Sequence, residues 1–399
     1  MYLLSISENV LLFISGLGII QGFLLAGLIY FHRGSDKSVN IFLAFYVFFI
    51  SCVMTMPISM NLVGWRNSYV IQPVPLLPGI VLYFYLRSFK ERITFKKMVP
   101  HLIPVAAFFA LSYFNLSAIS KLYPEAKDVP AEALKRPFSL LVMFVRMAQQ
   151  FMYYFLCLKA VRLYRHSIKN LFSETSRIDL KWAGFLINGY LVLIASFLVI
   201  FPLMLRYPEH FNLLLLINMT VATPYLYLVT YRGFMQHTIW QVRPENNKQT
   251  VQEELQKMEI RHADKVPEEV IKPVKPGTDT NKMGEIARRI TELMENDKLY
   301  QEPELTLQHL ADKLQQQPYL ISQAINDGMK KSFYDLVNGY RVEEAKRLLL
   351  HPGNRNYTIL SVGFEAGFNS KTTFNTVFKK FTGFTPTEFR DRNKIAGTA

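Results

Sequence analysis

Cysteine and acidic side chains are scarce in the apolar parts of this chain. Only two cysteines occur among the 399 residues, Cys52 and Cys157, and both lie inside apolar runs. Two isolated cysteines exclude a disulfide framework and leave no cysteine spacing that could ligate a metal. We therefore expect no metal and no cofactor, and we interpret both cysteines as small buried apolar side chains.

The motifs of common catalytic sites are missing as well. The chain has no His-Glu-x-x-His helix, no Gly-x-Ser-x-Gly turn and no glycine-rich phosphate loop, and its long apolar runs contain no paired carboxylates. Only Glu8, at the edge of the first run, is acidic, which argues against a proton relay. We expect no catalytic residues and therefore no enzyme, and the sequence gives no support for a transporter.

Long apolar runs dominate what is present. Seven of them in residues 1–231 reach the roughly 20 residues of helix that a membrane span needs. They lie near residues 9–31, 39–60, 70–89, 99–118, 138–159, 183–205 and 211–231. The third has Pro73, Pro75 and Pro78 at one end, which fits a helix entry or a kinked start better than a regular span. The sequence therefore predicts a bundle of seven transmembrane helices.

Loop charge predicts how this bundle is oriented. If the N-terminus is outside, the cytoplasmic loops carry 13 Lys and Arg residues and the opposite loops carry six. Because Lys and Arg accumulate on the cytoplasmic side, we expect the N-terminus outside and, after an odd number of spans, the C-terminus inside. The longest loop, near residues 119–137, is too short for a folded sensor domain. A signal would have to reach the bundle directly, through lipid, a small ligand or a partner membrane protein.

One charged side chain lies deep in the fifth run. Arg146 is near its middle, and Gln149 and Gln150 follow at i+3 and i+4 on the same helix face. A charge at this depth usually faces the bundle interior or a water-filled cavity. Two interpretations stay open. One is a sensing site for an anionic or polar ligand, and the other is an arginine satisfied by backbone carbonyls or by Asn188 or Asn218 of another helix.

Residues 232–282 change abruptly to charged, amide and proline side chains, which predicts a charged flexible linker. The stretch 272–277 holds two prolines and a glycine, and we expect no regular element there. Val251, Leu255 and Met258 fall at i, i+4 and i+7. They allow a short juxtamembrane coiled coil, but two heptads are few, and a solvated helix is the preferred interpretation.

Residues 283–399 have the period of soluble amphipathic helices. One face of the opening helix is apolar, at Ile286, Ile290, Leu293 and Met294. Thr306 is suited to cap a helix over residues 307–314, and a polar turn then leads to a second helix that starts at Pro318. Two short helices joined by a tight turn form the arrangement that places the second helix in a DNA major groove.

The pattern then repeats. A long helix is expected over residues 333–350, a short one over 358–366, and a further one after Ser370, which is suited to cap it. Residues 385–388 (TPTE) form a capping box with proline in the first turn and start a closing helix. The sequence therefore predicts an all-α protein, in which a seven-helix transmembrane bundle is followed by a soluble double helix-turn-helix domain.

The apolar periodicity also predicts which side chains of the two second helices point outward. The buried positions are Leu320, Ile321, Ala324 and Ile325 in the first, and Phe374, Val377, Phe378 and Phe381 in the second. The outward positions are Tyr319, Ser322, Gln323 and Asn326 in the first, and Lys371, Thr372, Asn375, Thr376 and Lys379 in the second. Such side chains suit base edges and phosphates, with an ordinary solvated helix face as the alternative. Lys379 and the adjacent Lys380 fit phosphates best.

Three stretches carry a family resemblance: residues 307–314 (LQHLADKL), 340–349 (YRVEEAKRLL) and above all 367–390 (GFNSKTTFNTVFKKFTGFTPTEFR). On these, residues 283–394 resemble the DNA-binding domain of AraC/XylS-type transcription regulators, of which a membrane-anchored variety exists. The resemblance implies two recognition helices, held by one central helix, that enter successive major grooves. It places base contacts on Tyr319, Ser322 and Gln323, and on Lys371, Thr372, Asn375 and Thr376.

Two positions depart from the family pattern. Lys330 stands where the family usually has a glycine that ends the first recognition helix, and Gly328 comes two residues earlier. Gly363 replaces the commoner alanine in the second motif. The first departure bears on how the chain leaves that helix, and neither threatens the fold.

These observations predict a bundle (1–231), a linker (232–282) and a DNA-binding domain (283–399) that together form a membrane-embedded transcription regulator, with the bundle as its sensor. An alternative is a factor released by proteolysis of the linker, the bundle being a passive anchor. The expected location is a bacterial inner membrane. Expected partners are double-stranded DNA and membrane lipid, with RNA polymerase and an unknown small ligand or membrane protein as further candidates. A homodimer is compatible with the fold but not required by it.

Overall fold

The computed structural model describes residues 2–31, 37–54, 56, 64–126, 131–175, 181–235, 276–354 and 356–396. Within these residues the chain is helical, apart from turns, bends and one β-bridge that pairs Phe172 with Thr306. The chain divides into two units, each described here by itself. Unit 1 comprises Met1–Leu163 and Leu180–Gln256, and unit 2 comprises Tyr164–Asp179 and Lys257–Ala399. The predicted all-α class is confirmed for the described residues.

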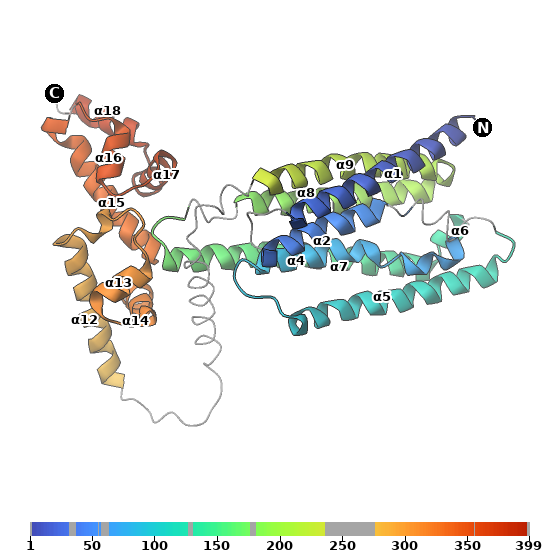
Figure 1. The fold of residues 1–399 in the computed structure, drawn as a ribbon, viewed down its shortest axis with the longest axis horizontal. Coiled ribbons are helices and arrows are strands. Elements are labelled where there is room, and N and C mark those ends of the chain that lie inside the picture. Colours follow the sequence, from blue (N-terminus) through green and yellow to red (C-terminus); the bar gives the residue numbers. More distant parts are fainter. Residues whose placement is uncertain are drawn as a thin grey trace. The chain divides into compact units, whose positions relative to one another are not determined.

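Unit 1 is built from long apolar helices, several of which run side by side (Figure 1). They are α1 (Tyr2–Phe31), α2 (Lys37–Met54), α4 (Leu77–Arg87), α5 (Phe95–Leu122), α6 (Ala131–Leu134), α7 (Pro137–Leu171), α8 (Lys181–Arg206) and α9 (Phe211–Met235). Short 3₁₀ turns lie at Trp65–Val70, Val74–Leu76 and Pro208–His210. The last turns of α7, from Tyr164 onward, belong to unit 2.

The predicted count of seven spans is not confirmed. Among the described residues, six stretches are long and apolar enough to cross a membrane: Leu12–Phe31, Trp65–Arg87, Phe95–Leu122, Pro137–Leu171, Trp182–Arg206 and Leu213–Gly233. The second predicted span, at 39–60, corresponds to a shorter apolar helix over Asn40–Met54. That helix stops short of the roughly 20 residues needed for a full crossing, and residues 57–63 lie outside the described residues.

The proline-rich entry of the third span has the form that the sequence predicts. Pro73 caps the 3₁₀ turn at Val74–Leu76 and Pro75 lies within it, and Pro78 lies in the first turn of α4, where a missing N–H costs no helix hydrogen bond. Only Leu77–Arg87 is regular α-helix in this stretch. The start of the span is therefore irregular, and its later part is a normal helix.

Small residues let the helices of unit 1 approach closely. Helix α1 packs against α2 and α9, and α8 packs against α9. A Cβ at Gly22 of α1 would lie 1.6 Å from Oγ of Ser51 in α2, and a Cβ at Gly189 of α8 would lie 1.9 Å from the ring of Tyr225 in α9. Helix pairs in membranes gain stability from this kind of close packing rather than from water exclusion. Cys157 is buried here and Cys52 is half-buried.

Unit 2 contains the helices predicted for the C-terminal domain (Figure 1). They are α12 (Pro276–Glu295), α13 (Leu307–Leu314), α14 (Pro318–Gln323), α15 (Phe333–Leu350), α16 (Ile359–Glu365), α17 (Lys371–Thr382) and α18 (Pro386–Ala396), with a π-helical turn at Ala324–Gly328 and 3₁₀ turns at Leu299–Gln301 and Pro352–Asn354. Helix α12 starts at Pro276, so the prediction of no regular element over 272–277 is wrong for its last two residues. A proline is tolerated there because the first helical N–H groups need no intrahelical partner. The coiled-coil positions at 251–258 lie outside the described residues.

Local capping fixes where these helices begin. Oγ1 of Thr306 accepts a hydrogen bond from the His309 backbone N–H, and Oγ of Ser370 accepts one from the Thr373 backbone N–H, each at 3.1 Å. The Thr385 N–H donates to Oε2 of Glu388 at 2.8 Å, while the Glu388 N–H donates to Thr385 at 3.3 Å. The caps and the capping box that the sequence predicts are confirmed.

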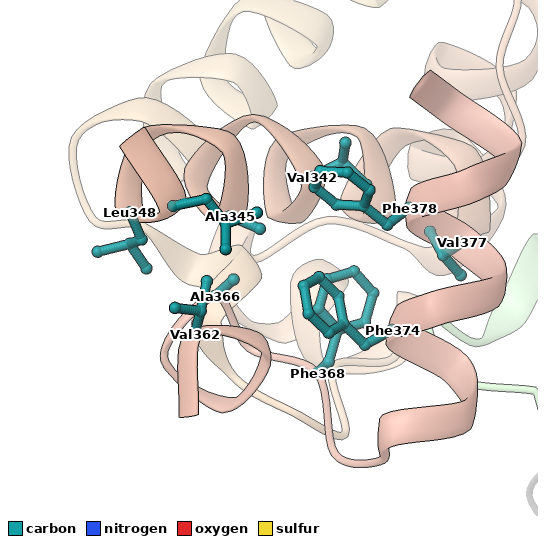
Figure 2. Close-up of a cluster of buried hydrophobic side chains, with 10 residues drawn as sticks. Val342, Ala345, Leu348, Val362, Ala366, Phe368, Phe374, Val377 and Phe378 are labelled. Atoms are coloured by element: carbon teal, nitrogen blue, oxygen red, sulfur yellow. The ribbon is translucent and has the colours of Figure 1, made fainter. Parts of the chain in front are cut away.

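The second motif packs on α15 through one buried cluster (Figure 2). Its members are Val342, Ala345, Leu348, Leu349, Val362, Ala366, Phe368, Phe374, Val377 and Phe378. The packing explains why glycine replaces the commoner alanine at position 363, because a Cβ there would lie 2.6 Å from the ring of Phe374. Two positions that the sequence predicts to be buried are less buried than expected. Phe381 is 41% exposed and Leu320 is half-buried, because both lie at the edge of their apolar face.

The other departure, Lys330 in place of the usual glycine, leaves a lysine in a backbone conformation that suits glycine. Its φ is 56°, in the left-handed region that glycine adopts without cost. Replacing Lys330 with glycine is therefore expected to stabilise unit 2 by about 1 kcal/mol, because relief of the left-handed conformation outweighs the extra freedom of the unfolded chain. Hydrogen exchange of the α15 amides in the full chain measures this change.

The matched control is Lys331→Gly, one residue further on, where φ is not positive. Glycine there only adds freedom to the unfolded chain, so it should lower stability by roughly 0.5–1 kcal/mol. If both glycine variants shift hydrogen exchange in the same direction, the left-handed conformation of Lys330 does not control stability.

Candidate functional site

The first candidate reading face lies on α14 and the π-helical turn that follows it. Tyr319 and Gln323 are exposed, and Ser322 and Asn326 are half-buried. The Asn326 side-chain amide donates to Oγ of Ser322 at 3.1 Å, so these two side chains form a pair within the helix. The structure places all four predicted residues within about two helical turns, while Ile321, Ala324 and Ile325 are buried on the other side.

The second reading face lies on α17, directly after its cap. Lys371, Thr372, Thr376 and Lys379 are exposed and Asn375 is half-buried. Thr373, Phe374, Val377 and Phe378 are buried on the opposite face. The helix therefore presents ammonium, hydroxyl and amide groups on one side, as predicted, and its apolar side fixes it to the domain core.

Lys379 and Lys380 differ in their surroundings. Nζ of Lys380 lies 2.5 Å from a carboxylate oxygen of Asp335 on α15 and also lies over the rings of Tyr334 and Phe381. Burial alone would raise the pKa of Asp335, but the hydrogen bonds from Lys380 and Ser332 lower it below its ordinary value. Lys380 is thus already engaged inside the domain, which leaves Lys379 as the better phosphate contact of the two.

The segment before the first motif is held on the central helix by Arg341, a residue that sequence reasoning missed. Arg341 lies on α15 and its side chain is 0% exposed. Its guanidinium donates to the backbone carbonyls of Tyr300 and Glu302, each at 2.7 Å. Burial lowers the pKa of Arg341 to about 10, so the group stays protonated at neutral pH. Apolar periodicity could have predicted its burial, since position 341 shares the apolar helix face of Val337 and Ala345.

Arg341 also contacts a short segment, Phe172–Glu174, that follows α7 and belongs to unit 2. Ser173 is fully buried, its backbone N–H donates to the Leu305 carbonyl at 3.2 Å, and its hydroxyl oxygen lies 3.3 Å from the Arg341 guanidinium. Oε1 of Glu174 accepts a hydrogen bond from the Thr373 hydroxyl at 3.2 Å.

The Phe172–Glu174 segment therefore bonds to both motifs. Leu305 precedes α13 of the first motif, and Thr373 lies in the first turn of α17. Asn338 of α15 adds a hydrogen bond from its side-chain amide to the Ser173 carbonyl at 2.9 Å. These pairings join residues more than 130 positions apart in the chain, so no local sequence pattern predicts them.

Inside unit 1, the predicted sensing residues lie on α7 beside a cavity of about 730 Å³. Arg146 is 7% exposed and lines this cavity. Its guanidinium contacts the sulfur of Met56 at 3.9 Å and lies 5.7 Å from the ring centroid of Phe197. Asn218 lines the cavity too, but its amide donates to Ser196 at 3.0 Å.

The two glutamines on the same face of α7 have a different task. The Gln149 amide donates to the Leu76 carbonyl at 3.2 Å, and the Gln150 amide donates to the Pro75 carbonyl at 3.4 Å. Both carbonyls lie in the proline-rich entry before α4, where few backbone N–H groups can reach them. Gln149 and Gln150 therefore bond to that irregular turn, and Gln150 also lines the cavity. Among the described residues that line the cavity, Arg146 is the one with a charged side chain.

Comparison with known proteins identifies the C-terminal part. Residues 310–392 match the protein family described as Helix-turn-helix domain. No curated protein and no solved structure matches the chain. The match spans both reading faces, α14 and α17, and the α15 helix between them. The chain thus carries an AraC-type helix-turn-helix domain of a DNA-binding transcription regulator at residues 310–392, behind N-terminal helices apolar enough to span a membrane.

Proposed function

We propose that the protein is a membrane-embedded transcription regulator that binds specific DNA sequences and senses a signal in its helical bundle. The observation that carries the DNA-binding part is the pair of capped helices, α14 and α17, that present polar faces on a common central helix. The 18 residues of α15 give a helix of about 27 Å, and successive major-groove sites lie about 34 Å apart. The two helices can therefore serve neighbouring grooves.

The base contacts are assigned to the exposed and half-buried polar side chains of the two reading faces. They are Tyr319, Ser322, Gln323 and Asn326 on the first, and Lys371, Thr372, Asn375 and Thr376 on the second. Lys379 meets a phosphate, which positions the domain without reading sequence. RNA polymerase is the partner through which the DNA-bound protein would act on transcription. A second copy of the chain is not needed, because one chain supplies a helix for each of the two neighbouring major grooves.

The orientation has the N-terminus outside and the DNA-binding domain in the bacterial cytoplasm. This needs α2 to cross the membrane as a seventh span. Support comes from its packing, because α2 contacts α1, α4 and α9 and buries Tyr46 and Val47 among them. Its 18 residues give about 27 Å of helix, close to the roughly 30 Å of the hydrocarbon core. The excess of Lys and Arg in the loops of the cytoplasmic side supports the same orientation.

Helix α7 supports sensing over passive anchoring. It carries Arg146 beside the cavity of unit 1, and its last turns and the Phe172–Glu174 segment pack within unit 2. Helix α7 therefore has residues in both units, Arg146 in the first and Tyr164–Leu171 in the second. Cleavage of the linker would leave this second connection in place, which disfavours simple release by proteolysis.

The test is a genome-wide DNA-crosslinking profile of the full-length protein, beside a variant in which Lys371 and Asn375 are both alanine. We expect a set of sites bound by the native protein and lost in the variant, and these sites name the target genes. Sites from residues 276–399 expressed alone, with none from the intact protein, would favour release by proteolysis. The absence of sites from both would refute DNA binding.

A further inference from the structure

The cavity of unit 1 combines a buried cation with apolar walls. Arg146 lines it, and the sequence places no acidic residue inside any apolar run apart from Glu8 at an edge. Within the described residues the guanidinium meets a thioether sulfur and an aromatic ring rather than a carboxylate. Burying a cation at this depth without a hydrogen-bonding anion is costly. The site therefore lacks an anionic partner for the Arg146 guanidinium among the described residues.

Two hydroxyl groups point to the same conclusion. Oγ of Ser112 and the phenol oxygen of Tyr190 are buried and have no hydrogen-bond partner in the described part of the chain, and both residues line this cavity. Buried polar atoms are rarely left without a partner, because each costs about 1–3 kcal/mol. Helices α5, α7 and α8 each contribute one of these three groups. A polar group in the cavity that reaches them would supply the missing partners.

The remaining walls define the rest of the occupant. They are mostly aliphatic, aromatic and thioether side chains, among them Ile50, Met54, Met143, Leu193, Phe201 and Met219. A volume of about 730 Å³ is in the range of cavities that hold small molecules. Methionine walls adapt to chains of different shape. A polyhydroxylated ligand would lose its hydrogen bonds to water without replacement, so the walls favour an apolar body.

We infer that the cavity binds an anionic amphiphile: one carboxylate, sulfonate or phosphate group held by Arg146, with an apolar chain among the other walls. This rests on the proposed sensing function. A guanidinium is the side chain best suited to such anions, because its planar fork can donate two parallel hydrogen bonds. The ligand chemistry is shared by a free amphiphile and by the head and one chain of an anionic lipid.

The cavity also indicates the side of entry. It reaches Gly64 and Trp65 before α4, Leu134 before α7, and Pro208 before α9. These positions belong to the three loops that lie outside in the proposed orientation. An amphiphile can therefore enter from the outer leaflet. Its anionic group would then lie beside Arg146 of α7, a helix whose last turns belong to unit 2.

The test uses the full chain in phosphatidylcholine nanodiscs, with radiolabelled dodecanoate as the probe and empty nanodiscs as background. Arg146→Gln is expected to weaken dodecanoate binding about tenfold or more, the usual value of a charge-assisted hydrogen bond. Arg146→Lys keeps the charge but not the planar fork, so it should weaken binding less than Arg146→Gln, and this ranking separates loss of charge from misfolding. The matched control is Arg162→Gln, an exposed arginine on the same helix that does not line the cavity and should change nothing.

Equal binding by native protein and Arg146→Gln, or equal affinity for neutral dodecanol, would overturn the assignment. Nanodiscs that contain phosphatidylglycerol distinguish the two sources: competition with dodecanoate assigns the site to an anionic lipid, and its absence assigns it to a free amphiphile. DNA affinity is measured in the same nanodiscs. Dodecanoate binding that leaves DNA affinity unchanged refutes the sensing function while the ligand site stands.

Discussion

Replacing Lys371 and Asn375 together with alanine is expected to weaken binding of the specific DNA site by about 30-fold or more. Each lost base contact costs about 1–3 kcal/mol, and the two side chains lie on the same exposed face of α17. Neither is a core residue, because the apolar face formed by Phe374, Val377 and Phe378 stays intact. Fluorescence anisotropy of the full chain in nanodiscs, with a labelled site from the crosslinking profile at fixed salt, measures the change.

Two single variants make this result specific. Lys379→Ala should weaken binding to all sequences alike and lower the salt dependence by about one ion, as expected for a phosphate contact. Lys346→Ala removes a lysine of the same domain that pairs with Glu343 on α15, and it should leave DNA affinity nearly unchanged. An unchanged affinity of the double variant would show that α17 does not read DNA.

Replacing Arg341 with methionine is expected to destabilise unit 2 by about 3–5 kcal/mol. The change removes the Arg341 donor of the buried Tyr300 carbonyl and one of the two donors of the Glu302 carbonyl, which keeps the Leu305 N–H at 3.3 Å; each lost hydrogen bond of this kind costs about 1–3 kcal/mol. It also removes a partner of Ser173, so the Phe172–Glu174 segment should detach more readily. Hydrogen exchange of α15 and of residues 299–305 in the full chain measures both effects.

The matched control for this prediction is Arg347→Met, on the same helix. Arg347 is exposed and pairs with the buried carboxylate of Glu344 at 2.7 Å, which Lys298 also faces at 4.0 Å; because solvent screens the Arg347 partner, its loss should cost only about 1 kcal/mol. Both variants exchange an arginine for a side chain of similar length on α15. A loss for Arg341→Met no larger than that for Arg347→Met would contradict the role assigned to the buried guanidinium.

The C-terminal domain could be predicted closely because its signals are local. Thr306, Ser370 and the capping box at 385–388 lie within three residues of the groups that they cap, and helix bounds follow from them. The outward positions of α14 and α17 followed from apolar periodicity alone. Phe381 and Leu320 were assigned wrongly as core, because periodicity does not show where a neighbouring element ends.

What the sequence left out depends on contacts between distant residues. The sequence analysis assigned Arg341 neither to a reading face nor to the core. In the structure its guanidinium donates to three backbone carbonyls of the segment before α13. The docking of Ser173 on Leu305 and Asn338 has no periodic signature at all. In the bundle, Arg146 was found by its charge, but only the structure shows the cavity beside it and assigns Gln149 and Gln150 to the proline-rich turn.

The most direct test of the central claim is the size of the protein recovered on its target DNA. Cells that carry a C-terminally tagged chain are crosslinked, the DNA bound by the tagged protein is isolated, and the protein on it is separated by gel. If the regulator acts from the membrane, the chain on the DNA is full length and fractionates with the membrane before crosslinking. If only a C-terminal fragment is found on the DNA, the bundle is an anchor that is cut away, and the membrane-embedded account is wrong.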